Sequence, residues 1–301
     1  MKIAITGATG LVGTELVNQL SKQGHEITPI LRSSHNPFST NEHIHWNPNE
    51  GIIEQDKLEG HDAVIHLAGE SIDGRWTDEK KKRILSSRVA GTTLLSETIA
   101  RLKNPPKVLL SASGISYYGN QEGDHAVDES SPVGSDFLTQ VVVEWEKSTK
   151  PAEAAGVRVV YLRFGIVLSK EGGALAKMLT PFQIGVGGKI GHGKQMMSWI
   201  AIDDVAGVVA YLLKHDEISG PINMVAPNPV NNETFTKTLG EVLNRPTILP
   251  LTPSMLRLIF GEVADELLIN GVKVLPTRLQ ETGYTFKFPD LKEALIHLLK
   301  K

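Results

Sequence analysis

Apolar positions follow two different periods along the first half of the chain. Short, nearly continuous apolar runs at residues 2–5, 26–31 and 62–67 are typical of strands buried on both faces of a parallel sheet. Residues 11–23 instead carry apolar side chains at helical spacing, and Gly24 ends that predicted helix. The chain therefore begins as a strand–helix–strand unit.

The same alternation continues to about residue 165. The pattern predicts a strand near 44–46, a helix over roughly 78–102, a buried strand over 107–112, a helix over 136–155 and a strand over 157–163. Alternating strands and helices are typical of the α/β class, so we predict a Rossmann-type doubly wound parallel sheet. Right-handed crossovers place the carboxyl ends of its strands at one edge, where ligands bind.

The alternation loosens beyond residue 165. A glycine-rich loop at 185–194 precedes a helix predicted over 203–214, for which Asp203 or Asp204 is the expected N-cap. Further elements are predicted toward the end of the chain: a helix at 233–243, an apolar segment at 253–268 and a helix at 290–300.

These changes in pattern suggest two domains. We expect a dinucleotide-binding Rossmann domain over residues 1–165, to which residues 195–225 return. A smaller C-terminal substrate lobe is expected to consist of residues 166–194 and 226–301.

Composition narrows the possible functions. The 301 residues contain 41% hydrophobic and 22% charged residues, which is typical of a folded protein. The net charge of -3 gives no support for binding nucleic acid, and no apolar stretch is long enough to cross a membrane. The chain contains no cysteine, and His43 and His45 lack a third ligand, so no metal site is predicted. We expect a cytoplasmic protein with a small-molecule substrate, and the sequence leaves a homodimer open.

The most informative motif is the turn between the first strand and the first helix. It reads Gly7-Ala8-Thr9-Gly10-Leu11-Val12-Gly13, with glycines spaced G-x-x-G-x-x-G. In a dinucleotide-binding turn, the first glycine allows a tight bend, the second admits the pyrophosphate and the third lets the helix pack closely. The alternative is a plain strand–helix turn. We predict that Gly7, Thr9, Gly10, Leu11, Val12 and Gly13 bind a dinucleotide.

The end of the second strand bears on the choice of cofactor. NAD-binding proteins usually place an acidic residue there to bind the ribose 2′-hydroxyl. This chain has Arg32 and Ser33 instead, and the arginine could pair with a 2′-phosphate. We therefore predict NADP(H) over NAD(H), although an ordinary solvated arginine is the alternative.

Two further loops follow buried strands and should lie at the same edge. Ala68 and Gly69 are small enough for the adenine and ribose side of a cofactor to pass close to the backbone. Glu70 and Arg75 come next, and they either face a substrate or form a surface ion pair.

The second of these loops follows the strand at 107–112. It supplies Ser113, Tyr117 and Tyr118, whose hydroxyl groups could hydrogen-bond a substrate carbonyl or hydroxyl. The alternative is a serine-rich loop with a buried tyrosine pair.

Together these motifs carry a family resemblance. ITGATGLVG, DAVIHLAGE, SSRVAGT, SASGISYYG and LRFGIVL resemble the extended short-chain dehydrogenase/reductase superfamily of NAD(P)-dependent epimerases and dehydratases. GGKIGHGKQMMSWIAIDD and NPVNNETFTKTLGEVLNRPTILPLTP resemble an atypical branch, the 39U-type epimerase family proteins, which has its own C-terminal domain.

The resemblance implies roles for particular residues. Arg88 stands where many extended members carry an asparagine beside the nicotinamide ribose, so it is expected to contact cofactor or substrate; a solvated helix arginine is the alternative. Leu67 and Ala68 match backbone positions along the adenosine side of the cofactor. Ser113 matches the serine that polarises the substrate.

The chain departs from that family at one important place. Typical members use a tyrosine as acid/base, with a lysine four residues later, at the start of the helix predicted over 136–155. Residues 135–145 contain neither at that spacing. Two hypotheses follow: an NADP(H)-dependent oxidoreductase or epimerase-like enzyme in which Tyr117 or Tyr118 supplies the proton, and a non-catalytic NADP(H)-binding sensor or scaffold.

Overall fold

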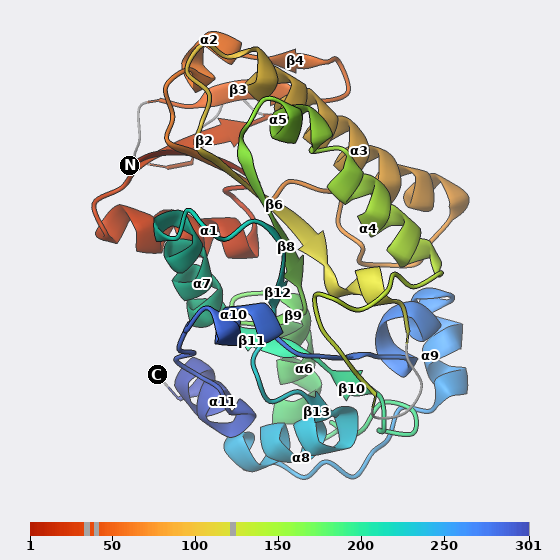
Figure 1. Ribbon diagram of the computed structural model, residues 1–301. Coiled ribbons are helices and arrows are strands. Elements are labelled where there is room, and N and C mark those ends of the chain that lie inside the picture. Colours follow the sequence, from red (N-terminus) through yellow and green to blue (C-terminus); the bar gives the residue numbers. More distant parts are fainter. Residues whose placement is uncertain (33–36, 39–41, 121–124, 301) are drawn as a thin grey trace.

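The central feature of the protein is a twisted, mostly parallel sheet (Figure 1). The computed structural model describes residues 1–32, 37–38, 42–120 and 125–300. Within these ranges the main sheet has eight strands in the order β12-β8-β6-β5-β1-β2-β3-β4. The strands are β1 (Lys2–Thr6), β2 (Glu26–Leu31), β3 (Ile44–Asn47), β4 (Ile52–Ile53), β5 (Ala63–His66), β6 (Val108–Gly114), β8 (Arg158–Phe164) and β12 (Gly220–Met224). Every neighbouring pair is parallel except β3 and β4, which confirms the predicted Rossmann-type fold class.

Helices cover both faces of this sheet. On β1, Ile3 and Ile5 belong to the core cluster beneath one pair of helices, whereas Ala4 belongs to the cluster on the opposite face. The first pair is α1 (Leu11–Lys22) and α7 (Ile202–Lys214), and the helices opposite are α3 (Asp78–Arg101), α4 (Phe137–Lys147) and α5 (Lys150–Ala154). Burial on both faces explains why the central strands are mostly apolar.

The rest of the chain adds a second packed region beyond β8. Its core includes the fully buried side chains of Trp199 and Phe235. The elements around this core are β9 (Ile166–Leu168), β11 (Trp199–Ala201), α6 (Gly173–Gln183), α8 (Asn232–Leu243) and α11 (Leu291–Leu299). The smaller elements are α2 (Gln55–Leu58), η1 (Ile115–Tyr118), β7 (Ala126–Val127), β10 (Met196–Met197), β13 (Val230–Asn231), α9 (Pro253–Phe260), the π-helix η2 (Ala264–Ile269), β14 (Lys273–Val274) and α10 (Thr277–Glu281).

The chain crosses between the two packed regions more than once. After β11 it continues into α7, which packs against α1, and then into β12, which pairs with β8 at the edge of the main sheet. The domain limits expected from the sequence remain a proposal. Among the described residues, no helix combines the length and apolarity needed to cross a membrane.

Two local predictions need correction. The helix predicted over 136–155 is divided into α4 and α5, because Pro151 lies in the first turn of α5 and has no N–H to continue the hydrogen bonds of α4. The N-cap of α7 is Ala201, not an aspartate. The carboxylate of Asp204 instead accepts backbone N–H bonds from Lys287 at 2.7 Å and Phe288 at 2.9 Å, so it ties the C-terminal segment to α7.

Candidate functional site

The glycine turn lies between the carboxyl end of β1 and the start of α1. Gly7 has a φ of +67°, and a Cβ added there would lie 2.9 Å from the carbonyl carbon of Leu67. A Cβ on Gly13 would lie only 2.1 Å from the Gly7 carbonyl oxygen. Gly10 is different, because it is exposed and a Cβ there would meet only that same oxygen, at 3.3 Å. The fold itself therefore requires two of the glycines, and the third leaves the backbone open to solvent.

The start of α1 is suited to an anion. Gly10 is the N-cap and gives no side-chain hydrogen bond, and the first turn carries no acidic residue. The first N–H groups of a helix have no partner within the helix and carry the positive end of its dipole. The amides of Leu11 and Val12, beside the exposed Gly10, therefore fit the pyrophosphate of a dinucleotide.

Hydrogen bonds hold the chain segment after β5 beside the glycine turn. The hydroxyl of Thr6 accepts the backbone N–H groups of Leu67 at 3.0 Å and Ala68 at 3.2 Å. That hydroxyl also lies 2.7 Å from Nδ1 of the buried His66. These bonds hold the predicted adenosine-side residues in a fixed place, and the next residue, Gly69, is exposed.

The predicted 2′-phosphate contact lies at the end of β2. Arg32 directly follows that strand and is exposed, and β2 pairs with β1, which leads into the glycine turn. The guanidinium is therefore free to approach a ligand from solvent at the same edge of the sheet. Ser33 lies outside the described residues.

Arg88 lies beneath the backbone of Gly69. Its Nη1 donates to the carbonyl oxygens of Glu70 at 3.0 Å and Ile84 at 3.1 Å, and its Cζ lies 4.9 Å from the centre of the Trp145 ring. Burial lowers the pKa of Arg88 to about 10, so it is still a cation at neutral pH. The structure therefore places a half-buried positive charge beside the exposed backbone after β5.

Glu70 and Arg75 have different surroundings. The carboxylate of Glu70 forms ion pairs with Lys80 at 2.8 Å and Arg83 at 3.6 Å, and the hydrogen bond from Lys80 lowers its pKa. Arg75 is exposed and lies beside Gly261, where an added Cβ would be 3.2 Å from its Nε. Glu70 therefore pairs with helix α3, and a substrate role for either residue remains a proposal.

Ser113 belongs to a buried charged network. Its Oγ donates to Oε1 of Glu146 at 2.6 Å. The guanidinium of Arg163 donates two hydrogen bonds to the same carboxylate, from Nε to Oε1 at 2.8 Å and from Nη2 to Oε2 at 2.9 Å. The side chains of Arg163 and Glu146 are only 4% and 11% exposed. We call Ser113, Glu146 and Arg163 the serine–carboxylate network.

The two tyrosines of η1 enclose this network. Tyr118 is fully buried; its hydroxyl donates to Asn223 at 2.7 Å and accepts from Arg163 at 3.0 Å. Burial raises the pKa of Tyr118 to about 12. This geometry counts against the predicted catalytic role of Tyr118, because its hydroxyl is held inside the protein. Tyr117 is half-buried, with its ring centre 3.4 Å from Cζ of Arg163, and it stays a candidate.

Sequence reasoning missed Glu146 and Arg163. Arg163 lies in the mostly apolar second half of β8 and is buried. A buried cation needs a carboxylate or several acceptors to offset the loss of water. That rule would have predicted an acidic partner. It would not have identified Glu146, because many acidic residues are distributed along the neighbouring helices.

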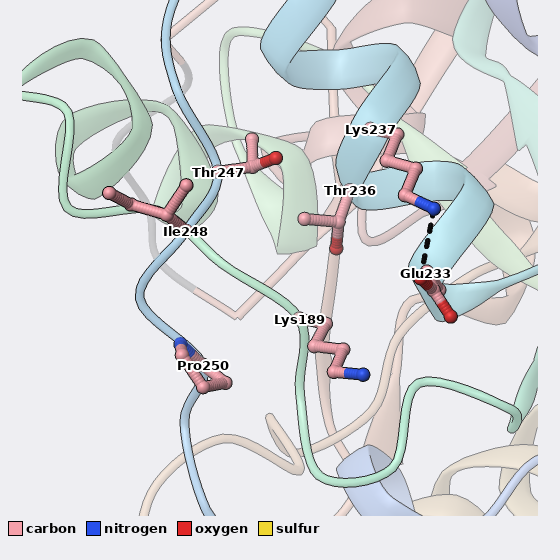
Figure 2. Close-up of a pocket in the computed structure, with 7 residues that line it drawn as sticks. All are labelled: Lys189, Glu233, Thr236, Lys237, Thr247, Ile248 and Pro250. Carbon is pink, nitrogen blue, oxygen red and sulfur yellow. Dashed lines mark ion pairs between the residues drawn. The ribbon is translucent and has the colours of Figure 1, made fainter.

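Figure 2 shows a pocket in a different part of the molecule. Its walls come from the glycine-rich loop, α8 and the segment after it, and include Lys189 and the ion pair between Lys237 and Glu233. None of the residues lining this pocket belongs to the glycine turn, β6 or α4. We therefore place the candidate site at the carboxyl edge of the sheet, where the glycine turn and Ser113 lie.

A parallel sheet, a glycine turn open at Gly10 and an uncapped helix start define a Rossmann-type nucleotide-binding protein. Comparison with known proteins gives the same class. Residues 3–225 match the NAD dependent epimerase/dehydratase family, and residues 253–298 match a domain of unknown function, DUF1731. The chain belongs to the NAD dependent epimerase/dehydratase family.

Several relatives match over nearly their whole length. The epimerase family protein Mb2239 of Mycobacterium bovis is 38% identical over 294 residues, which is 97% of this chain and 96% of that protein. YfhF of Bacillus subtilis is 38% identical over 300 residues, 99% and 98% of the two chains. These matches confirm the predicted branch of epimerase family proteins.

Solved structures agree with this assignment. A crystal structure of the human epimerase family protein SDR39U1 with NADPH has a TM-score of 0.91 and 34% identity, and the match covers 100% of this chain and 99% of that one. A UDP-N-acetylglucosamine 4-epimerase from Bacillus cereus has a TM-score of 0.77 at 18% identity, covering 99% and 98% of the two chains, and this likeness concerns the fold alone.

Proposed function

We propose that this chain is an NADP(H)-dependent oxidoreductase or epimerase-like enzyme of the extended short-chain dehydrogenase/reductase type that acts on a small molecule. The observation that carries the proposal is the turn at Gly10, where exposed backbone meets an uncapped helix start. Arg32 at the end of β2 favours the 2′-phosphorylated cofactor. The human relative of similar structure binds NADPH, which supports the same choice.

Different residues at the sheet edge would bind different parts of the cofactor. The amides at Leu11 and Val12 would hold the pyrophosphate, and Arg32 would pair with the 2′-phosphate. Leu67, Ala68 and Gly69 would line the adenosine side, and Arg88 would contact the ribose or a negatively charged group near it. When bound, NADP(H) supplies or accepts a hydride at the nicotinamide ring. Ser113 would orient the oxygen of the substrate at which this hydride is exchanged.

A second function, that of an NADP(H)-binding sensor or scaffold without catalysis, has one observation in its favour. The hydroxyl of Tyr118 is buried in hydrogen bonds, and residues 135–145 supply no tyrosine and lysine at the usual spacing. If no other residue moves a proton, cofactor binding would be the whole function.

Both proposed functions require NADPH binding, which calorimetry tests. Gly10→Val should abolish binding and leave the fold intact, because the side chain projects where the phosphates approach and meets only one backbone atom at 3.3 Å. Gly24→Asn is the matched control, because nothing lies within 4 Å of a Cβ there and asparagine tolerates its positive φ. Normal NADPH binding by folded Gly10→Val would place the cofactor elsewhere.

Turnover separates the enzyme from the sensor. The protein should oxidise NADPH, followed by its absorbance, with at least one member of a panel of ketones, aldehydes and keto sugars. It should reduce NADP⁺ with the matching alcohol. Tight NADPH binding without turnover across the whole panel, in both directions, would favour the sensor.

A further inference from the structure

The serine–carboxylate network offers what the missing tyrosine and lysine would otherwise provide. It joins three segments that are distant in sequence: the end of β6, the last turns of α4 and β8. Ser113 and Arg163 are direct partners in the register of β6 and β8. A hydroxyl, a carboxylate and a cation therefore meet at the carboxyl edge of the sheet, on the strand that leads into η1.

The direction of the hydrogen bond limits what Ser113 can do. Arg163 donates hydrogen bonds to both carboxylate oxygens of Glu146, so both oxygens act as acceptors. The proton in the 2.6 Å contact must then come from Ser113. Ser113 Oγ then has a lone pair left to accept a hydrogen bond, but no hydrogen left to donate one. Ser113 is therefore set to receive a proton from a substrate hydroxyl.

We propose that Ser113 is the catalytic residue that accepts the proton of a substrate alcohol, and that Glu146 is the positioning residue that takes the proton of Ser113 in turn. This rests on the proposed function and makes its substrate an alcohol or the matching ketone or aldehyde. As the carbinol O–H proton moves to Ser113 Oγ, the Oγ–H proton moves to Glu146 Oε1. The carbinol C–H bond breaks with its electron pair, and this hydride reduces NADP⁺. The products are a carbonyl compound, NADPH and protonated Glu146.

The groups around the carboxylate fit this role. Arg163 fixes both oxygens of Glu146, and burial alone would lower the pKa of Arg163, but hydrogen bonding and attraction to Glu146 raise it. The aromatic ring of Tyr117 covers the guanidinium, and the Tyr118 hydroxyl holds its Nη1. Arg163 is therefore kept charged and in place, and it holds the carboxylate of Glu146 in a fixed position against Ser113.

The absence of cysteine from the chain allows a direct test without any substrate. Ser113→Cys introduces a single thiol, and its ionisation can be followed by thiolate absorbance near 240 nm, with the wild type as background. With Glu146 present, the thiol should titrate above the ordinary value of about 8.5, because the carboxylate opposes a second negative charge. In Ser113→Cys/Glu146→Gln, the unpaired Arg163 should lower the pKa of the thiol by at least about one unit, which is a tenfold change in its acid constant.

A matched control comes from the same helix. Glu144 is exposed and paired with Lys147 at 2.7 Å, so Ser113→Cys/Glu144→Gln should titrate like Ser113→Cys alone. Equal titration of the thiol in all three proteins would overturn the proposal, because Glu146 would then have no influence on the proton at position 113.

Turnover completes the test. Ser113→Ala and Glu146→Gln should lower kcat for alcohol oxidation at least about 100-fold, with the NADPH dissociation constant unchanged within about twofold, whereas Glu144→Gln should behave as the wild type. Glu146→Asp should recover part of the loss. If the wild type turns over and Glu146→Gln is equally fast, this proposal is wrong and the proposed function stands. If the wild type binds NADPH but turns over nothing, both are overturned in favour of the sensor.

Discussion

The glycine turn and the serine–carboxylate network lie at the same edge of the sheet but are built in opposite ways. The turn would bind its ligand through backbone groups, and two of its glycines have no room for even one more carbon atom. The network consists of side chains from three separate segments, held by charge and hydrogen bonds in a site with little access to water. A substitution in the turn should cause a steric clash with the backbone. A substitution in the network should instead leave an unpaired charge, which a second substitution can remove.

The largest expected effect is in the turn. Gly13→Ala places a Cβ 2.1 Å from the Gly7 carbonyl oxygen, and both atoms belong to backbone that cannot move without separating α1 from β1. We expect a loss of more than about 5 kcal/mol in the free energy of unfolding, which would leave little folded protein. Gly10→Ala should change the free energy of unfolding by less than about 1 kcal/mol. Urea unfolding of both variants checks this, and a stable Gly13→Ala protein would contradict the steric account.

A somewhat smaller effect is expected in the network. Arg163→Met leaves the carboxylate of Glu146 buried without its cation, which should cost about 3–5 kcal/mol of unfolding free energy. The second substitution in Arg163→Met/Glu146→Leu removes the unpaired charge and should recover at least half of that loss. Urea unfolding of the two single variants and the double variant measures the coupling. Strictly additive losses would mean that the two side chains do not depend on each other.

The third prediction concerns pH and the support of the glycine turn. Burial lowers the pKa of His66 from 6.5 to about 4, where its ring nitrogens contact Thr6 and Thr92. The unfolded chain binds a proton at His66 between pH 6.5 and 4 but the folded one does not, so stability is lost as the pH falls through this window. The loss reaches at most about 3 kcal/mol. Chemical denaturation of wild type and His66→Gln at pH 7 and pH 4.5 should show a smaller pH dependence in the variant; identical dependence would contradict the shift.

The smallest effect is expected for the choice of cofactor. The protein should bind NADPH at least about tenfold more tightly than NADH, a difference of about 1.4 kcal/mol, and Arg32→Ala should remove most of that preference. Lys22→Ala is a control for loss of positive charge, because Lys22 lies at the far end of α1. Calorimetry of the wild type and both variants with each cofactor measures the six affinities. Equal affinities in the wild type, or an unchanged preference in Arg32→Ala, would remove Arg32 from the site.

The comparison also shows which features could be predicted from sequence. The turn at Gly7 to Gly13 depends on neighbours in the chain, so glycine spacing and apolar period correctly predicted the fold and the position of the turn at the carboxyl edge of the sheet. Leu67 and Ala68 were placed correctly beside the turn because parallel strands end at a common edge. Their contact with a cofactor is still a prediction.

The network could not be predicted in the same way. Glu146 and Arg163 lie on different elements, 17 positions apart, and nothing in their spacing requires them to pair. Tyr117 and Tyr118 are adjacent in sequence, yet only Tyr118 is fully buried, because its hydroxyl reaches Asn223 on β12. Such contacts depend on how β12, β8 and α4 pack together, which the apolar pattern does not specify.

The central claim is that the turn and the network serve one ligand, and a crystal structure of this chain with NADPH tests it most directly. We predict that the pyrophosphate lies on the amides of Leu11 and Val12, the 2′-phosphate beside Arg32 and the nicotinamide ring against Ser113, with the hydrogen bond from Ser113 to Glu146 intact. A nicotinamide directed away from β6, with Ser113 still enclosed by protein, would contradict the claim and leave the network with only a structural role.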